Sequence, residues 1–177
     1  DHEHEGDGHS HDTTPGSDID DHDGDGHSHE SSSAASSDQS GEIIDFSVLE
    51  PEDIAAAFRG ALERKDESAV RALLLPDVFI SEGGGAERSM DEYASNNMAA
   101  DMELSAGVEQ SVQDQRVQMS GDTAWIIAEI VSHGRFRDRD IHSRLMETMV
   151  LTRTENGWRI AHIHWSSAPI AESDHEH

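Results

Sequence analysis

The sequence predicts an α+β fold in which N-terminal helices pack in a strongly curved, mainly antiparallel sheet, with disordered acidic His-rich tails at both ends. Three observations predict this fold. Helix signals are confined to residues 51–100, long strand patterns fill the chain after Gly107, and residues 1–40 contain one large apolar side chain, Ile19. Helices followed by a run of strands are typical of α+β proteins, whereas a parallel α/β sheet requires the two to alternate.

The tails are predicted from composition. Residues 1–40 contain no Lys or Arg and are mostly Asp, His, Gly, Ser and Glu. Such a segment buries too little apolar area to offset an ordering entropy of roughly 1–2 kcal/mol per residue. We therefore expect a disordered tail over 1–41, a folded domain over 42–170 and a short acidic His tail over 171–177.

Three helices are expected at the start of the domain. Pro51 suits a first helical position and is followed by two acidic residues, Glu52 and Asp53. A second helix over 67–75 ends at Pro76. Ser89 caps a third helix that runs to about residue 100, and Glu92 stands at the capping-box spacing from it. Between the last two helices we expect a short strand over 77–82 and a glycine loop over 83–85.

Four long strands are expected after Gly107, over 108–119, 123–136, 139–153 and 158–167. Gly121-Asp122 and Asn156-Gly157 are turn signals between them. Strict alternation in the last strand places Trp158, Ile160, His162 and His164 on one face and Arg159, Ala161, Ile163 and Trp165 on the other. Both faces of 124–131 are apolar, so one covers the helices and the other needs a second cover. We therefore expect a homodimer through the sheet.

Charge limits the choice of partners. The 177 residues contain 12 Lys and Arg against 38 Asp and Glu, a formal net charge of −26. Nucleic acid and anionic membranes are polyanions and are therefore not expected partners, and no apolar run is long enough for membrane insertion. The absence of Cys excludes disulfides and thiolate chemistry. The sequence given begins at Asp1, which a removed secretory signal or a trimmed chain would explain. We favour the signal and expect an extracytoplasmic protein, periplasmic or secreted.

A nine-residue pattern repeats near the N-terminus, where residues 4–12 match 22–30 if Asp and Glu are exchanged. Neutral imidazoles bind Zn, Cu and Ni, and flanking carboxylates can complete such sites. Asp21-x-Asp23-x-Asp25-Gly26 also matches half of a calcium loop, so Ca is possible. The alternative is an acidic solubilising tail. The candidate metal ligands are His2, His4, His9, His11, Asp21, Asp23, Asp25, His22, His27, His29, His175 and His177, with His162 and His164 on the last strand.

Three segments of the domain resemble the nuclear transport factor 2-like superfamily, which includes ketosteroid isomerases and SnoaL-like polyketide cyclases. They are residues 54–58 with the run Leu73 to Ile80, the strand opening from Gly121 to Trp125, and the final strand from Asn156 to Ser166. The resemblance covers about residues 50–168. It implies a cone-shaped domain with a pocket at its open end, and folds of this kind carry enzymes, binders and association domains alike.

Candidate catalytic residues are Glu147, His164 and Tyr93. Glu147 interrupts an otherwise apolar strand face, where a buried carboxylate needs a partner. It should therefore either line a polar pocket or pair with Arg. A raised pKa would make such a carboxylate a general base. His164 could be a core histidine instead, and Tyr93 lies on the third helix rather than where the resemblance would place an isomerase tyrosine.

Three functions remain open from the sequence. The leading one is an exported protein that binds or buffers a divalent transition metal through its tails, with the domain as a dimeric scaffold or small-molecule binder. The second is an isomerase, cyclase or hydrolase acting on a hydrophobic small molecule in the domain's pocket. The third is an assembly module without catalysis.

Overall fold

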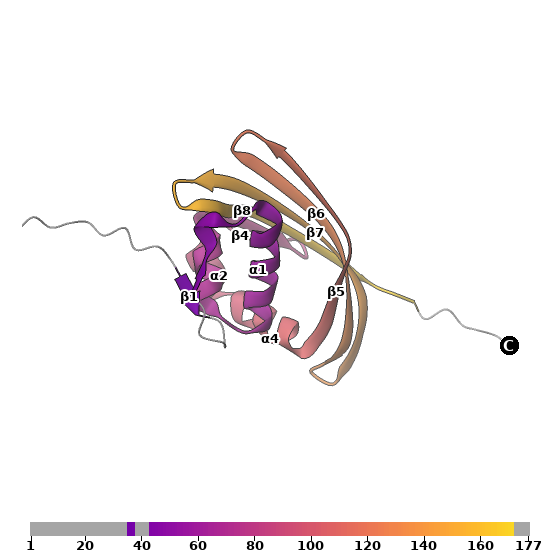
Figure 1. The fold of residues 1–177 in the computed structure, drawn as a ribbon. Helices are drawn as coiled ribbons and strands as arrows, with labels where there is room; N and C mark the ends of the chain where they lie inside the picture. Colours follow the sequence, from indigo (N-terminus) through magenta and orange to yellow (C-terminus); the bar gives the residue numbers. More distant parts are fainter. Residues whose placement is uncertain (1–34, 38–42, 172–177) are drawn as a thin grey trace, which may run out of the picture. The chain divides into compact units, whose positions relative to one another are not determined.

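The computed structural model describes residues 35–37 and 43–171. In this part of the chain helices come first and a long meander of strands follows (Figure 1). The helices are η1 (Phe46–Val48), α1 (Pro51–Glu63), α2 (Glu67–Leu73), α3 (Met90–Ser95) and α4 (Met98–Gly107). The strands are β1 (Ala35–Ser37), β2 (Ile43–Asp45), β3 (Leu74–Glu82), β4 (Gly85–Glu87), β5 (Val108–Ser120), β6 (Thr123–Phe136), β7 (Arg139–Thr154) and β8 (Gly157–Pro169).

The main sheet has six strands in the order β4-β3-β8-β7-β6-β5. Strands β5 to β8 form an antiparallel meander, while β3 pairs with β8 in parallel. The long strands curve around the side on which α1 and α4 lie (Figure 1). The α+β class and the curved sheet packed on helices are therefore confirmed.

The core fills the space between the helices and the concave face of the sheet. Phe58 of α1, Ile126 of β6, Met149 of β7 and Trp158 of β8 are all almost completely buried in one cluster. At 20–30 cal/mol per Å² of buried apolar area, large side chains of this kind supply the main driving force of folding. The helical spacing and strand alternation that predicted these elements place these side chains on the inner surface.

Two predicted boundaries are wrong. The predicted third helix is in fact two helices, α3 and α4. They are separated by Asn96 and Asn97, and the backbone leaves helical geometry at Asn96. The strand predicted over 77–82 is β3, which begins earlier, at Leu74, and runs through Pro76. The second helix, α2, therefore ends at Leu73. The expected tail over 1–41 lies outside the described residues except for β1, which pairs antiparallel with β2.

The last strand departs from strict alternation. Between β7 and β8 the register slips, because Val150 pairs with His162 while Leu151 pairs with Ile160. Ala161 is therefore an extra residue, a β-bulge that changes the face to which the following residues point. Ile160 and Ile163 are both buried as a result. His162 and His164 do share a face, but not the face of Trp158 and Ile160.

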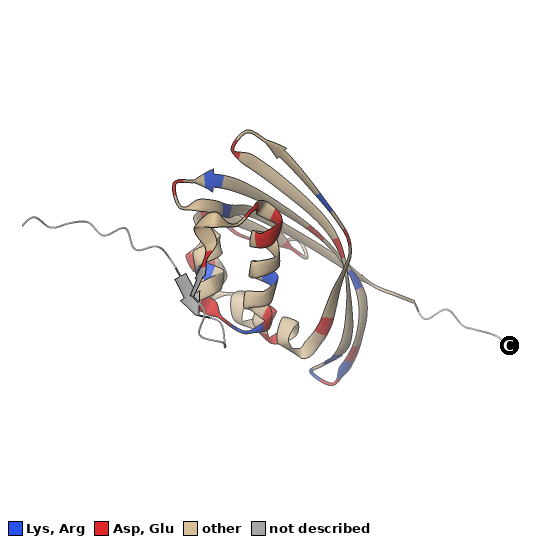
Figure 2. Ribbon diagram, in the orientation of Figure 1, with Lys and Arg blue, Asp and Glu red and all other residues tan. Residues whose placement is uncertain are grey.

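Charge is distributed unevenly over the described elements. Figure 2 shows Lys and Arg at scattered positions on helices and strands, with Asp and Glu more frequent.

No helix in the described part of the chain is long and apolar enough to cross a membrane.

Candidate functional site

A cavity of about 350 Å³ opens between the helices and the concave face of the sheet. Its walls come from α1, α4, β3 and the four long strands. Eleven of the 19 lining side chains are polar, but apolar atoms make up most of the lining surface. The lining residues are Arg59, Leu62, Glu82, Asp101, Leu104, Ser105, Gln110, Ile130, Ser132, Asp140, Ile141, His142, Ser143, Leu145, Glu147, Trp165, Ser167, Ala168 and Pro169. An apolar pocket with a few convergent polar groups is the usual form of a small-molecule site.

Asp101 is the most perturbed acid of this pocket. It lies in the first turn of α4, and burial raises its pKa from 3.8 to about 7. The hydroxyl of Tyr93 on α3 donates to its Oδ2 at 2.8 Å, which opposes that rise, and the charges of Glu82 and Glu87 add to it. A carboxyl with a pKa near neutrality can both accept and return a proton at physiological pH.

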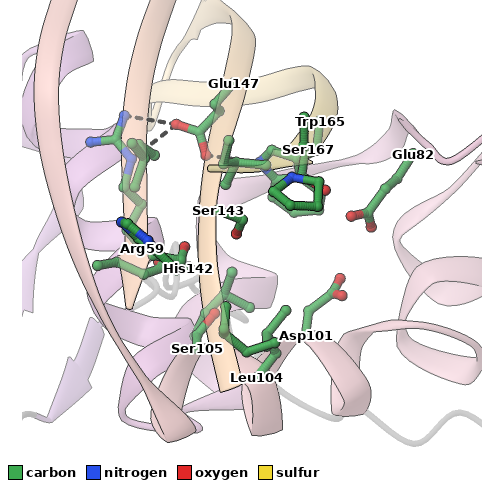
Figure 3. A pocket seen from close by; sticks show the side chains of 18 of the residues that line it. Arg59, Glu82, Asp101, Leu104, Ser105, His142, Ser143, Glu147, Trp165 and Ser167 are labelled. Carbon is green, nitrogen blue, oxygen red and sulfur yellow. Dashed lines mark hydrogen bonds and ion pairs between the residues drawn. The ribbon is translucent and has the colours of Figure 1, made fainter. Parts of the chain in front are cut away.

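Glu82 faces the same part of the cavity from the end of β3. In Figure 3 its carboxylate and that of Asp101 point toward each other across the pocket. Burial raises the pKa of Glu82, and the charge of Glu87 raises it further. Neighbouring carboxyls in an apolar site cannot both ionise easily, so they tend to hold one proton between them.

Asn97 and Glu87 support this acidic end from behind. The Asn97 side-chain amide donates to Oε1 of Glu87, and burial raises the pKa of Glu87. Asn97 also stands at the break between α3 and α4. The break turns the chain so that Tyr93 on one helix meets Asp101 on the next.

An ion pair between Arg59 and Glu147 lies in the cavity wall opposite Asp101 and Glu82. Nε and Nη2 of Arg59 on α1 donate to Oε1 of Glu147 on β7, at 2.9 and 2.7 Å. The indole Nε1 of Trp165 on β8 donates to the other carboxylate oxygen at 2.9 Å (Figure 3). Gln115 accepts from Arg59 at 3.1 Å. Glu147 is only 2% exposed, so these three donors keep a buried charge satisfied.

Of the three predicted catalytic residues only Glu147 lines the pocket, and Tyr93 reaches it indirectly, through its hydrogen bond to Asp101. Glu147 lines it and is also paired with an Arg, so both alternatives weighed for it hold together. Tyr93 is fully buried beneath Asp101 and does not line the cavity. His164 is exposed, and the bulge at Ala161 places it on the opposite face of β8 from Trp158 and Ile160.

Of the predicted metal ligands, only His162 and His164 lie within the described residues. His162 and His164 lie together on the outer face of β8, where Nδ1 of His162 is 2.7 Å from the carbonyl oxygen of Phe79. The described residues contain no group of three His, Asp or Glu side chains arranged to hold a metal. The remaining candidates lie outside the described residues: His2, His4, His9, His11, Asp21, Asp23, Asp25, His22, His27, His29, His175 and His177.

Three functional residues escaped sequence reasoning. In the sequence, Asp101 lies just past the end of the predicted third helix, Arg59 looks like a solvent-facing helix residue and Glu82 ends the predicted short strand. The one signal available was Glu147, because a buried acid on an apolar strand demands a cation from another element. It could not indicate which of the chain's 12 basic residues would serve.

Known structures share this architecture. A candidate ketosteroid isomerase from Shewanella frigidimarina NCIMB 400 is 35% identical, with a TM-score of 0.62 over 64% of this chain and 92% of that one. A candidate dehydratase of the NTF2-like family from Streptomyces avermitilis is 22% identical, with a TM-score of 0.56 over 71% and 97%. The CaMKII hub from S. rosetta is also 22% identical, with a TM-score of 0.59 over 68% and 98%.

No protein of curated function matches the chain. The family described as the SnoaL-like domain matches residues 52–171, which begin in α1 and include the whole main sheet and every residue of the pocket. The chain therefore belongs to the SnoaL-like domain family.

Proposed function

We propose that the domain is an acid–base enzyme that moves a proton on an apolar small molecule, as in an isomerisation or a dehydration. The observation that carries this proposal is Asp101, a carboxyl with a pKa of about 7 in the wall of an apolar cavity. The names of two similar structures, a candidate ketosteroid isomerase and a candidate dehydratase, support the same reaction class.

Each polar group has a role in this proposal. The ionised Asp101 removes a proton from a carbon next to a carbonyl, and the same carboxyl returns it to another carbon. Glu82 faces Asp101 across the cavity, and its charge helps to raise the pKa of that base. Tyr93 is a positioning residue that fixes the Asp101 carboxyl. The neutralised pair Arg59–Glu147 holds the far wall and leaves the apolar lining to bind the substrate.

The substitution Asp101→Asn tests the proposal. The probe is a β,γ-unsaturated ketosteroid, whose conversion to the conjugated enone is followed by ultraviolet absorbance. We expect kcat/KM of the wild type to rise with pH toward a plateau above about pH 7, because the base must be ionised. The Asn variant should lose at least about 100-fold, the usual contribution of general-base catalysis.

Asp77→Asn is the matched control, because Asp77 is an exposed carboxyl on β3, away from the cavity. It should leave kcat/KM unchanged. A folded Asp101→Asn variant with wild-type activity would contradict the assignment of the base. If the wild type turns over neither the steroid nor smaller β,γ-unsaturated ketones, the proposed reaction class is wrong.

Metal binding by the His-rich segments is a second proposal, supported by the repeat of residues 4–12 at 22–30. A homodimer and an extracytoplasmic location likewise stay predictions. Mass-spectrometric metal analysis of the purified chain, intact and without residues 1–40, tests metal binding. Equal metal content in both would place the ion elsewhere.

A further inference from the structure

Two histidines face each other across the β6–β7 hairpin. His133 and His142 are directly paired in the antiparallel register, and their ring centroids lie 5.8 Å apart with an interplanar angle of 78°. Both residues are exposed. Neither ring makes a hydrogen bond or an ion pair with another residue that the structure describes, so both can change rotamer without breaking a contact.

This spacing suits a shared metal ion. Residues paired across antiparallel strands have Cβ atoms about 4.5–5.5 Å apart. Two imidazoles on such positions can turn one nitrogen each toward a common ion at the usual metal–nitrogen distance of about 2.0–2.1 Å. Rings that already lie 5.8 Å apart need only rotate, because the strands hold their Cβ atoms in place.

The surroundings favour a cation. Glu109 of β5 is paired with His133 in register, so its negative charge lies on the strand next to that histidine. The nearest cations are already neutralised, since Arg144 pairs with Glu129 at 2.7 Å and Arg135 lies 3.8 Å from Asp138. The formal net charge of −26 further attracts cations to the molecule.

We propose that His133 and His142 form a two-histidine chelate for a divalent transition metal such as Ni²⁺ or Zn²⁺, completed by water. This site shares His142 with the lining of the cavity, but it contains none of the residues to which the proposed catalysis assigns a role. It is also distinct from the His-rich segments, because it exists only when the β6–β7 hairpin is folded.

That dependence on folding supplies the test. Histidines close in sequence, such as His9 and His11, stay close in the unfolded chain, so an ion bound there need not raise the melting temperature. His133 and His142 are brought together by folding, so an ion between them binds the native state preferentially and stabilises it. At pH 7.5 and metal about 100-fold above Kd, we expect Tm of the full chain to rise by about 5 °C or more.

The variants His133→Asn and His142→Asn should each abolish this rise while leaving the metal-free Tm nearly unchanged, because both side chains are exposed. His164→Asn is the matched control: it removes an exposed histidine on β8 that has His162 beside it. The rise should persist in this control and disappear near pH 5.5, where imidazole is protonated.

Three results would overturn the proposal. They are no metal-dependent rise in the wild type, a rise that survives His142→Asn, and a rise that His164→Asn abolishes, which would move the ion to β8. If aggregation obscures melting, broadening of histidine ring signals by Ni²⁺ in NMR replaces it as the readout. Broadening confined to other histidines would equally exclude the pair.

Discussion

At the scale of single residues, Asp101 gives the folded domain a distinctive pH dependence. Burial raises its pKa to about 7, against 3.8 for the ordinary carboxyl of the unfolded chain. The native state therefore binds this proton more tightly than the unfolded state does. The contribution to stability is greatest below about pH 4 and is lost as pH rises to about 7.

We therefore predict that Asp101→Asn is more stable than the wild type at pH 8. The gain should be at most about 4 kcal/mol, from roughly three pKa units at about 1.4 kcal/mol each. Near pH 4 the two should differ little, because an amide resembles a protonated carboxyl and can still accept from Tyr93. Urea unfolding from pH 4 to 8 measures this, with Asp77→Asn as control. A gap that does not widen with pH would contradict a raised native pKa.

The Arg59–Glu147 pair is the other residue-scale feature with a measurable energy. Arg59→Met leaves the Glu147 charge buried with only the Trp165 indole as donor, and we expect a loss of about 3–5 kcal/mol. Glu147→Gln should also destabilise. The double variant should lose less than the sum, with a coupling of more than about 1 kcal/mol.

A double-mutant cycle by urea unfolding measures that coupling. The exposed pair Arg137–Glu103, also at 2.9 Å, is the comparison and should couple by less than about 1 kcal/mol. Equal coupling in both cycles would mean that burial gives the pocket pair no special role.

At the scale of elements, the strand meander was predictable because Gly121, Asn156 and Gly157 mark its turns and the apolar pattern is long. The bulge at Ala161 was not, since nothing local distinguishes this alanine from one in regular alternation. It follows from packing, as both Ile160 and Ile163 are needed in the core. For the same reason the site was only half predictable: Glu147 is conspicuous on its own strand, whereas Asp101 is perturbed by groups from other elements.

Gly157, in the turn between β7 and β8, provides an element-scale prediction. Its φ is +91°, and an added Cβ would lie 2.7 Å from the Cα and carbonyl oxygen of Ser47 in η1. Both contacts are backbone, so η1 would have to move away from β8. We expect Gly157→Ala to destabilise the domain by about 2–3 kcal/mol or more, which exceeds the cost of the left-handed conformation alone.

Gly121→Ala is the matched control, with φ +59° and open space around its added Cβ. It should cost about 1 kcal/mol. Thermal unfolding of both variants measures the difference. If the two variants have the same melting temperature, η1 can move away from β8 at little cost, and it is not held against the hairpin of β7 and β8.

At the scale of the whole molecule, the outer face of the sheet is incompletely covered. The inner residues Ala124, Ile126, Ala128 and Ile130 are buried as expected for one apolar face of β6. On the outer face Ile127, Met146 and Phe79 remain 42%, 40% and 40% exposed. The likeness to the CaMKII hub, an assembly domain by name, concerns the fold alone, so the exposed apolar residues carry the argument for a partner.

We predict that a second copy of the chain covers this face. A symmetric dimer places the same apolar residues of both copies against each other. The net charge of −26 on each chain opposes association, so added salt should strengthen the dimer by screening the repulsion.

Sedimentation velocity of the full chain at micromolar concentration should give a dimer at 0.3 M salt. Ile127→Glu should shift it to monomer, because a charge would be buried at the centre of the interface. Val48→Glu, at an equally apolar but 74% exposed position on η1, should remain dimeric. A wild type that stays monomeric at both low and high salt would show that this face is left open to water.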